Sequence, residues 1–287
     1  MPGASRLLDM LSCLARFSTV TKGARAMTDI VVPVEETREI WDAKADYWDT
    51  QMGEGNLFHR ELVGPAVERL LDIRPGELVL DIACGNGQLA RRLATLGARV
   101  VATDFSARFL ALARQRIEAL PEIAGQIELR EVDATDPGQL AALGDGRYDA
   151  ITCLMGLMDM PDIDPLLAAV PRLMRPGGRF VLAVQHPCFN SNDVRMVVEE
   201  DANGRRTSSL KISRYLTLPP GRGVGMPGEP APHWYFHRPL GELLGVAFRH
   251  GLVMDGVEEP SFTTPPNPER PLSWLSYPDI PPVFVAR

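Results

Sequence analysis

The sequence has few cysteines and no excess of basic charge. Its 287 residues include only four cysteines, Cys13, Cys84, Cys153 and Cys188, and their spacing fits neither a disulfide framework nor a metal site. We therefore expect free thiols, no bound metal and a reducing, cytoplasmic compartment. The net charge is −7, which is unfavourable for a nucleic-acid or anionic-membrane surface. We expect a small-molecule partner, with no nucleic acid and no membrane, and leave homo-oligomers open.

The first residues differ in composition from the rest of the chain. Within 1–27, four basic residues oppose a single acid, with several Ser and Thr between them. Such a composition is typical of a transit peptide, and it also fits an extended start upstream of Met27. The apolar run near the N-terminus is too short to cross a bilayer. We expect 1–27 to be a disordered extension.

Helical spacing dominates the next segment, 28–76. Trp41, Ala45 and Trp48 share one helix face, and a second apolar stripe follows the Gly-Glu-Gly-Asn break at 53–56. An aromatic stripe at this spacing usually packs into a core. Tyr47 lies off the stripe, so we expect Tyr47 rather than the tryptophans to face a ligand.

The most informative stretch is 79–90, Val-Leu-Asp-Ile-Ala-Cys-Gly-Asn-Gly-Gln-Leu-Ala. An apolar strand ends at an acid, and a glycine-spaced turn leads into a helix. Glycines let backbone N–H groups approach a ligand, and the helix N-terminus adds further donors. Taken alone, Gly85-x-Gly87-x-x-Ala90 also fits the dinucleotide fingerprint, with Asp104 as the ribose acid. An NAD-dependent oxidoreductase is therefore one reading of this motif.

Three later features follow in a fixed order. A second strand ends at Asp104, a third is followed by Asp133, and a Pro-Gly-Gly turn at 176–178 precedes a fifth, buried strand. Together with the loop at 83–87, this series resembles the class I S-adenosylmethionine-dependent methyltransferases over about 78–184. The resemblance implies S-adenosylmethionine as cofactor.

The resemblance also implies which residues contact the cofactor. The methionine end is lined by Asp81, Ala83, Cys84, Gly85 and Gly87. Asp104 holds the ribose, Phe105 packs beside the adenine, and Asp133 with Ala134 reads the adenine edge. Cys153, at the end of the fourth strand, is placed on the same rim. The family commonly has Gly where Ala83 stands, so a methyl group narrows the loop here.

The alternation of strands and helices predicts an α/β fold: a doubly wound, mostly parallel seven-stranded sheet of the Rossmann-like methyltransferase type. The methyltransferase domain is predicted at 77–287, after the N-terminal helices. Predicted strands are 78–81, 99–103, 126–132, 148–153, 178–184, 252–259 and 283–285. The stretch 187–238 breaks the pattern and is predicted to be an inserted substrate cap, with a hairpin pairing 195–200 and 207–218 through Asn203-Gly204.

Methyl transfer is an in-line displacement in which the protein mainly supplies alignment and exclusion of water. A hydroxyl acceptor also needs a base, and His186, directly after the fifth strand, is the first candidate. His237 and His233, at the exit of the cap, come next. We expect methylation of a small-molecule acceptor at O, N or C. Besides the oxidoreductase, a non-catalytic S-adenosylmethionine-binding scaffold is an alternative.

Overall fold

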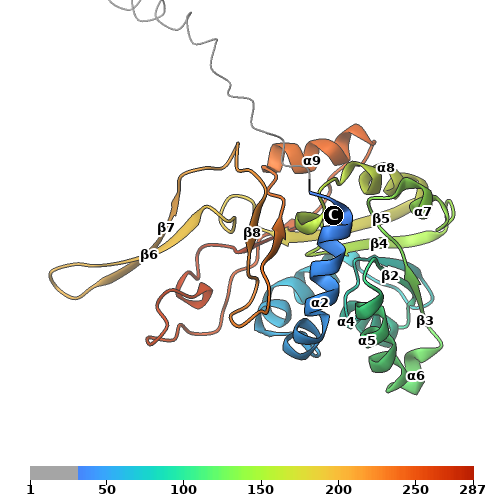
Figure 1. Cartoon of the computed structure of the whole chain (residues 1–287), viewed down its shortest axis with the longest axis horizontal. Helices are drawn as coiled ribbons and strands as arrows, with labels where there is room; N and C mark the ends of the chain where they lie inside the picture. The colour runs from blue at the N-terminus through green and yellow to red at the C-terminus, as the bar shows by residue number, and fades with distance from the viewer. Residues whose placement is uncertain (1–31) are drawn as a thin grey trace, which may run out of the picture. The chain divides into compact units, whose positions relative to one another are not determined.

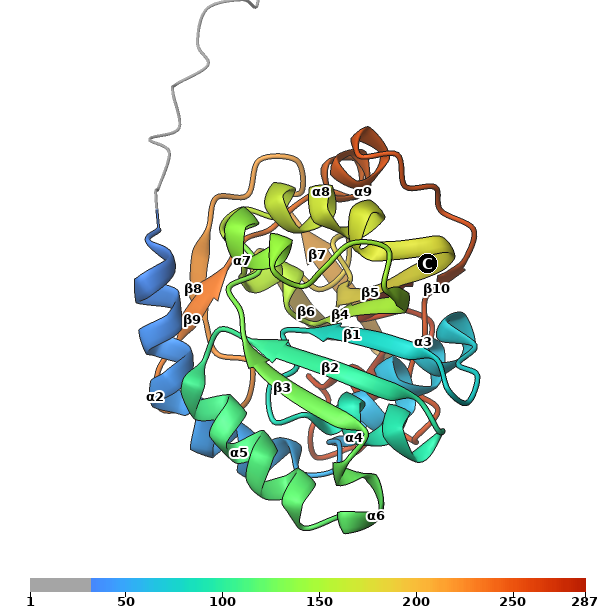
Figure 2. The same cartoon turned by 90° about the vertical axis from the view of Figure 1, so that its right-hand side faces the viewer.

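The computed structural model describes residues 32–287, so the expectation for 1–27 lies outside the described residues. Its centre is a seven-stranded sheet in the order β10-β11-β5-β4-β1-β2-β3, with helices on both faces (Figures 1 and 2). Within this order, the neighbouring strands β5, β4, β1, β2 and β3 are paired in parallel. Strand β11 is antiparallel to both of its neighbours, β5 and β10. The predicted mostly parallel α/β sheet is confirmed.

Two helical regions precede the sheet, as the apolar stripes predicted. Helix α2 spans Val34–Met52 and ends at Gly53, whose φ of 48° is a left-handed conformation that suits glycine. A π-helical turn, η1 (His59–Val63), runs into α3 (Gly64–Leu71). Pro65 lies in the first turn of α3, where its missing N–H is tolerated.

The alternating elements follow the predicted order with small shifts at their ends. They are β1 (Leu78–Ile82), α4 (Gln88–Thr95), β2 (Arg99–Asp104), α5 (Ala107–Glu118), α6 (Pro121–Ala124), β3 (Ile127–Glu131), α7 (Pro137–Ala141), β4 (Tyr148–Leu154), η2 (Leu157–Asp159), α8 (Asp164–Leu173) and β5 (Met174–Gln185). Strand β5 includes the Pro-Gly-Gly segment predicted as a turn, and its pairing with β4 shifts register there.

Alternate residues of the strands divide the core into two layers. Leu80 and Ile82 of β1 pack toward α8 and α9 (Leu240–Arg249), whereas Val79 packs with α3 and α4 on the opposite face. This alternation follows from the two-residue repeat of a strand. Because both faces are covered by helices, β1 and β4 are buried along nearly their whole length, as parallel strands commonly are.

The C-terminal edge of the sheet is formed by two short strands, β10 (Val257–Glu258) and β11 (Val283–Ala286). The predicted antiparallel pair is therefore present, but β10 is much shorter than 252–259. Proline-rich chain and a single 3₁₀ turn, η3 (Trp274–Ser276), lie between them. Among residues 32–287, no helix has the length and apolar character needed to cross a membrane.

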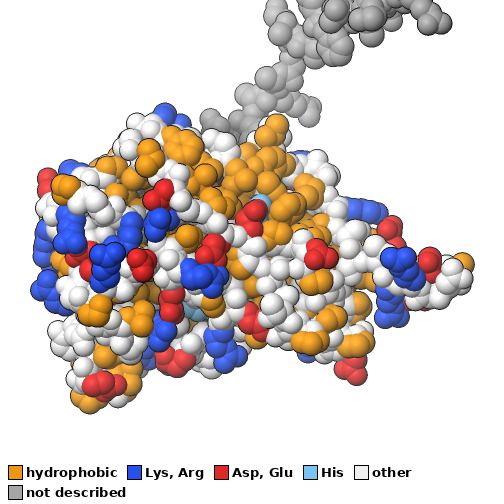
Figure 3. Space-filling view, turned by 180° about the vertical axis from the view of Figure 1, so that it is seen from behind, with side chains coloured by type: hydrophobic (Ala, Val, Ile, Leu, Met, Phe, Trp, Pro, Cys, Tyr) orange, Lys and Arg blue, Asp and Glu red, His pale blue; other side chains and the backbone are white. Residues whose placement is uncertain are grey.

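The inserted segment contains two separate hairpins. Strands β6 (Val194–Glu200) and β7 (Arg206–Ile212) form the predicted one, with β7 ending earlier than expected. Basic and acidic side chains lie together at its exposed tip (Figure 3). The second hairpin, β8 (Gly221–Gly223) with β9 (His233–Tyr235), was not predicted from the sequence. Its three-residue strands are too short to show a period in the sequence.

Candidate active site

A cavity opens at the carboxyl edge of β1, β2 and β4, under helix α2. Parallel α/β sheets bind ligands at this edge, because the loops that follow the strands diverge there. The cavity is lined by Val34, Thr37, Trp41, Trp48, Met52, His59, Asp81, Ala83, Cys84, Gly85, Asn86, Gln88, Leu89, Asp104, Phe105, Phe109, Val132, Asp133, Ala134, Thr135, Leu154, Met155, Gly156, Asp159, Met160 and Pro161. Most of the residues predicted from the sequence therefore line one cavity.

Asp81, at the end of β1, has one satisfied and one free carboxylate oxygen. Oδ1 accepts a hydrogen bond of 2.8 Å from Thr152 Oγ1, whereas Oδ2 is buried without a partner. Burial raises the pKa of Asp81 to about 7, and the nearby Asp104 adds to this, although the bond from Thr152 opposes it. A buried acceptor without a donor is costly, so this oxygen is suited to a ligand that brings one.

Asp104, at the end of β2, holds the glycine loop. Its Oδ2 accepts a hydrogen bond from Gly85 N at 2.8 Å, and its Oδ1 accepts one from Ser106 N at 2.9 Å. Burial raises its pKa to about 6, although these two N–H groups favour the charged form. Each oxygen still has a lone pair for a further donor. The carboxylate can therefore anchor the loop and bind a ligand together.

The loop between β1 and α4 adopts left-handed backbone at three positions. Gly85 and Gly87 have φ of 55° and 72°, and Ala83, where the related family commonly has Gly, has φ of 56°. Gly87 does not line the cavity, contrary to prediction: a Cβ there would lie 3.3 Å from Ala113 Cβ, so this glycine allows α5 to pack closely. Beside Ala83 in the cavity wall, a Cβ on Gly156 would lie 2.8 Å from Ala83 Cβ. The methyl group of Ala83 thus requires glycine at 156.

Asp133, just after β3, lines the cavity together with Phe105 and Ala134, and their contact with adenine stays a prediction. Its Oδ1 accepts hydrogen bonds from Thr135 N and Oγ1, and its Oδ2 lies 3.3 Å from Arg38 Nη2 of α2. The Arg38 guanidinium is 5.8 Å from the centre of the Phe105 ring. Helix α2 therefore contacts this end of the cavity through a side chain that the sequence did not single out.

The tryptophans of α2, rather than Tyr47, face the cavity. Trp41 and Trp48 line it and meet edge to face, with ring centroids 5.4 Å apart. The hydroxyl of Tyr47 instead donates a hydrogen bond of 2.7 Å to Pro227 O. The expectation for Tyr47 is corrected because the inserted segment covers its face of α2, which the sequence of the helix cannot reveal.

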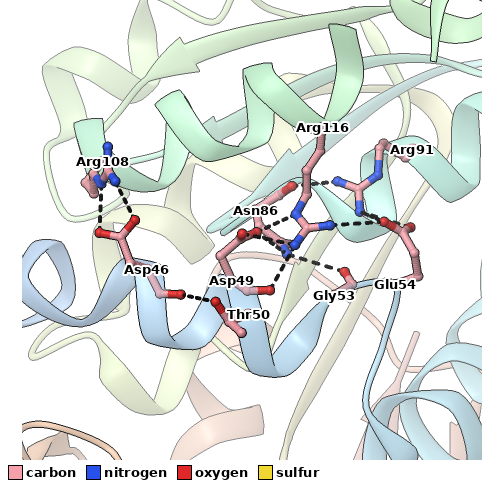
Figure 4. Close-up of polar contacts among 9 residues, drawn as sticks. All are labelled: Asp46, Asp49, Thr50, Gly53, Glu54, Asn86, Arg91, Arg108 and Arg116. Atoms are coloured by element: carbon pink, nitrogen blue, oxygen red, sulfur yellow. Dashed lines mark hydrogen bonds and ion pairs between the residues drawn. The ribbon is translucent and has the colours of Figure 1, made fainter. Parts of the chain in front are cut away.

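A polar network joins the end of α2 to the glycine loop (Figure 4). Asp49 accepts hydrogen bonds from Asn86 Nδ2 at 2.9 Å and from Arg116 Nη2 of α5 at 3.0 Å. Arg91 of α4 donates to Asn86 O at 2.7 Å and to Glu54 at 2.9 Å. Burial raises the pKa of Asp49, but the bonds from Arg116 and Asn86 outweigh it and lower the pKa overall. The loop is therefore clamped from three helices.

His186 does not reach the cavity. It is buried, its Nε2 lies 2.7 Å from Glu259 Oε1, and its Nδ1 accepts a hydrogen bond of 3.1 Å from Cys188 N. Both ring nitrogens are therefore engaged, with the proton on Nε2. Its ring also packs against Phe284. The prediction of His186 as a base is corrected. Its position directly after β5 did not reveal that its ring points toward Glu259 and Phe284 and away from the cavity.

Two other predicted site residues also lie elsewhere. His237 donates through Nε2 to Tyr215 O at 2.7 Å and lines a smaller hollow beside Gln185 and Asn190. Cys153 is fully buried inside the sheet, and burial raises the pKa of its thiol. The cavity is lined instead by the next three residues, Leu154, Met155 and Gly156. Cys84 does line the cavity, and its contact with the cofactor stays a prediction.

Sequence reasoning missed one acid of the cavity wall. Asp159, in η2 shortly after β4, lines the cavity, and its Oδ1 is buried without a hydrogen-bond partner. The sequence could have indicated it. Asp104 and Asp133 were selected because each lies at or just after the end of a strand, and Asp159 likewise follows β4. Among residues 32–287, no group of three His, Cys, Asp or Glu side chains is arranged to hold a metal ion.

The sequence also matches a known family over the part that builds this cavity. Residues 79–178, from β1 into β5, match the family described as "Methyltransferase domain". The fold, the cavity and this match agree with the class I S-adenosylmethionine-dependent methyltransferases, and residues 79–178 form a methyltransferase domain. The match favours this class over the dinucleotide reading of the glycine loop.

Individual relatives agree with the family. Over 108 residues, the chain is 37% identical to a ubiquinone biosynthesis O-methyltransferase of Xanthomonas oryzae pv. oryzae, covering 38% of this chain and 43% of that protein. Over 156 residues it is 31% identical to the protein of the same name from Acinetobacter baumannii, covering 53% and 62%. The chain thus spans about half the length of these relatives. An S-adenosylmethionine-dependent methyltransferase structure from Mesorhizobium loti aligns with a TM-score of 0.57 at 27% identity, over 77% of this chain and 94% of that one.

Proposed function

We propose that this protein transfers the methyl group of S-adenosylmethionine to a small-molecule acceptor. The observation that carries the proposal is the single cavity in which Asp81, Asp104 and Asp133 follow three neighbouring strands beside the glycine loop. The family supports the reaction, and the O-methyltransferase relatives support a small acceptor. The sparse cysteines, without disulfide-framework spacing, support a cytoplasmic location.

The residues of the cavity fit the chemical groups of S-adenosylmethionine. The free Oδ2 of Asp81 suits an ammonium group, and the remaining lone pairs of Asp104 suit ribose hydroxyls. Phe105, Ala134 and Asp133 offer a flat apolar face and an acceptor for an adenine ring. Left-handed Gly85 keeps side-chain atoms out of the loop. When bound, the cofactor supplies a methyl group on a positively charged sulfur.

The chain's own contribution is alignment and exclusion of water. Helix α2 covers the cavity with Trp41, Trp48 and Met52, and the cap segment holds α2 through Tyr47 and Trp48. Fixing two reactants in line removes most of the entropic barrier to a displacement reaction. Apolar walls also prevent water from competing with the acceptor.

The direct test uses S-adenosylmethionine carrying a deuterated methyl group. Incubated with a mixture of small metabolites, the protein should form S-adenosylhomocysteine and one or more products with a labelled methyl group, detected by mass spectrometry. Binding of S-adenosylhomocysteine without any labelled product would instead favour the non-catalytic scaffold. Binding of NADH without S-adenosylhomocysteine would contradict the proposal.

Cofactor affinity should depend on pH through Asp81. Since burial places its pKa at about 7 in the unliganded protein, the carboxyl is largely protonated at pH 5.5. A cofactor ammonium favours the carboxylate, so binding below pH 7 must release a proton. We expect the affinity for S-adenosylhomocysteine, measured by titration calorimetry, to be roughly tenfold lower at pH 5.5 than at pH 8.

The matched variant for this experiment is Asp81→Asn, which keeps the shape of the side chain and cannot titrate. It should bind more weakly at pH 8 and lose most of the change in affinity between pH 6.5 and 8. Asp104, with a pKa of about 6, contributes below that range in both proteins. A wild-type affinity that stays constant from pH 5.5 to 8 would show that Asp81 does not bind the ammonium group.

A further inference from the structure

Four ionisable side chains meet inside the protein between α2, η2 and the inserted segment. Lys44 of α2 and Glu229 form an ion pair, and both side chains are fully buried. His233 of β9 contacts Lys44 Nζ through its Nδ1, which lies 3.2 Å from Glu229 Oε1. Glu229 also accepts a hydrogen bond of 2.8 Å from Trp48 Nε1. The fourth member, Asp159, forms the boundary between this cluster and the cavity.

The cluster orients His233 toward Asp159. A lysine ammonium has only donors, so His233 Nδ1 accepts from Lys44 and its ring proton lies on Nε2. This Nε2 faces Asp159 Oδ1 at 3.8 Å. Burial, followed by the charge of Lys44, lowers the pKa of His233 to about 4, so the ring is neutral near pH 7. Lys44 and Glu229 therefore hold the neutral ring of His233 beside Asp159, at a distance too long for a hydrogen bond.

Asp159 is the member of the cluster that a ligand can reach. It lines the cavity, its side chain is 13% exposed, and its Oδ1 has no hydrogen-bond partner. Burial raises the pKa of its carboxyl well above the usual range, although the charge of Lys44 lowers it. A raised pKa makes the ionised carboxylate a stronger base, and a cofactor with a positively charged sulfur in the same cavity would favour that ionised form. A buried carboxyl without a partner destabilises a fold by about 1–3 kcal/mol. A functional contact would explain why it is retained.

The wall around Asp159 restricts the acceptor. Trp41, Trp48 and Met160 provide flat apolar surfaces, which favour a planar aromatic ring. No Lys or Arg is among the described residues that line the cavity, and Arg38, at the end near Asp133, is already paired with that carboxylate, so a carboxylate or phosphate on the acceptor would lack a counter-ion. A carboxylate base can take the proton of an aromatic hydroxyl, whose pKa is about 10 as in tyrosine. An alkyl alcohol is a far weaker acid.

We propose that Asp159 binds the hydroxyl group of a neutral phenolic acceptor and accepts its proton during methyl transfer. This inference rests on the proposed function. Asp159 takes the proton as the O–H bond breaks, and that electron pair remains on oxygen, which forms the new bond to the methyl carbon. The electron pair of the broken S–C bond stays on sulfur. One negative charge on Asp159 and one positive charge on sulfur disappear together, and Asp159 later returns its proton to solvent.

The test compares wild-type protein with Asp159→Asn and with a matched control, Asp162→Asn. Asp162 lies three residues further along the same loop and is exposed. Each protein is saturated with S-adenosylhomocysteine and titrated calorimetrically with phenol, toluene, cyclohexanol or aniline. Thermal unfolding of each protein is measured as well. These readouts need no turnover and no knowledge of the natural acceptor.

We expect wild-type protein and Asp162→Asn to bind phenol at least about tenfold more tightly than toluene or cyclohexanol. Asp159→Asn should lose about tenfold in phenol affinity, bind S-adenosylhomocysteine as wild type does, and unfold at an equal or higher temperature. Labelled methyl transfer to any phenolic product should fall by about 10²–10⁴-fold.

Several results would overturn the proposal. One is equal affinity of the wild type for phenol and toluene, which requires no variant to fold. Others are tighter binding of aniline than of phenol, unchanged phenol affinity in Asp159→Asn, or a clear fall in its unfolding temperature, which would indicate a structural role. Failure of the wild type to bind S-adenosylhomocysteine would instead contradict the proposed function itself.

Discussion

Replacing Asp104 with Ala is expected to weaken the binding of S-adenosylhomocysteine by about 30- to 100-fold at pH 8. The carboxylate has two tasks that the variant loses together. It holds Gly85 N and Ser106 N at 2.8 and 2.9 Å, and its remaining lone pairs face the cavity where ribose hydroxyls would lie. Hydrogen bonds to a charged group contribute about 1.5–3 kcal/mol each. Loss of the bonds to the loop and to the ribose together should therefore weaken cofactor binding strongly. Titration calorimetry measures the difference directly.

Glu131→Ala is the matched control for Asp104→Ala. Glu131 is the neighbour of Asp104 in the register of β2 and β3, but its side chain is exposed and does not line the cavity. The Glu131→Ala variant should bind S-adenosylhomocysteine as tightly as the wild type does. If Asp104→Ala keeps wild-type affinity while remaining folded by circular dichroism, Asp104 has no part in cofactor binding.

Replacing Gly85 with Ala should reduce the affinity for S-adenosylhomocysteine by at least about tenfold. A Cβ at this position meets only Phe109, at 4.0 Å, and would otherwise extend into open space beside the cavity. The substitution also forces alanine into a φ of 55°, which costs about 1–2 kcal/mol for a residue with a Cβ. Two effects are therefore mixed in this variant and must be separated.

Gly146→Ala separates them. Gly146 has almost the same φ, 59°, with no atom within 4 Å of a built Cβ, and it lies away from the cavity. Both variants should lower the midpoint of thermal unfolding to a similar extent, whereas only Gly85→Ala should lose cofactor affinity. Equal affinities in the two variants would mean that the glycine loop does not contact the cofactor.

Much of the fold and of the cofactor side of the cavity could be predicted from local patterns. The order of strand, acid and loop placed Asp81, Asp104 and Asp133 at one edge of the sheet, because parallel strands end on the same side. The helices of 34–71 were visible as apolar stripes at helical spacing. Short β8 and β9 were missed because strands of three residues carry no measurable period.

The acceptor side could not be predicted in the same way. Lys44 and His233 are 189 residues apart in the chain, and neither has a local sequence context that indicates a buried contact. Nor does a strand boundary determine where a side chain points after the strand ends. His186 follows β5 as expected, yet packing against Phe284 and a bond to Glu259 turn it away from the cavity.

The sequence by itself determined the parallel sheet, the glycine loop and the row of acids, because strand periodicity and backbone sterics act over a few residues. Only the tertiary structure decided which side chains of α2 face the cavity, that His186 is a packing residue, and that Asp159 lies against a buried ion pair. These outcomes depend on contacts between segments far apart in the chain. Burial then sets the pKa values of Asp81, Asp104 and Asp159, since desolvation is a property of the folded surroundings and not of the local sequence.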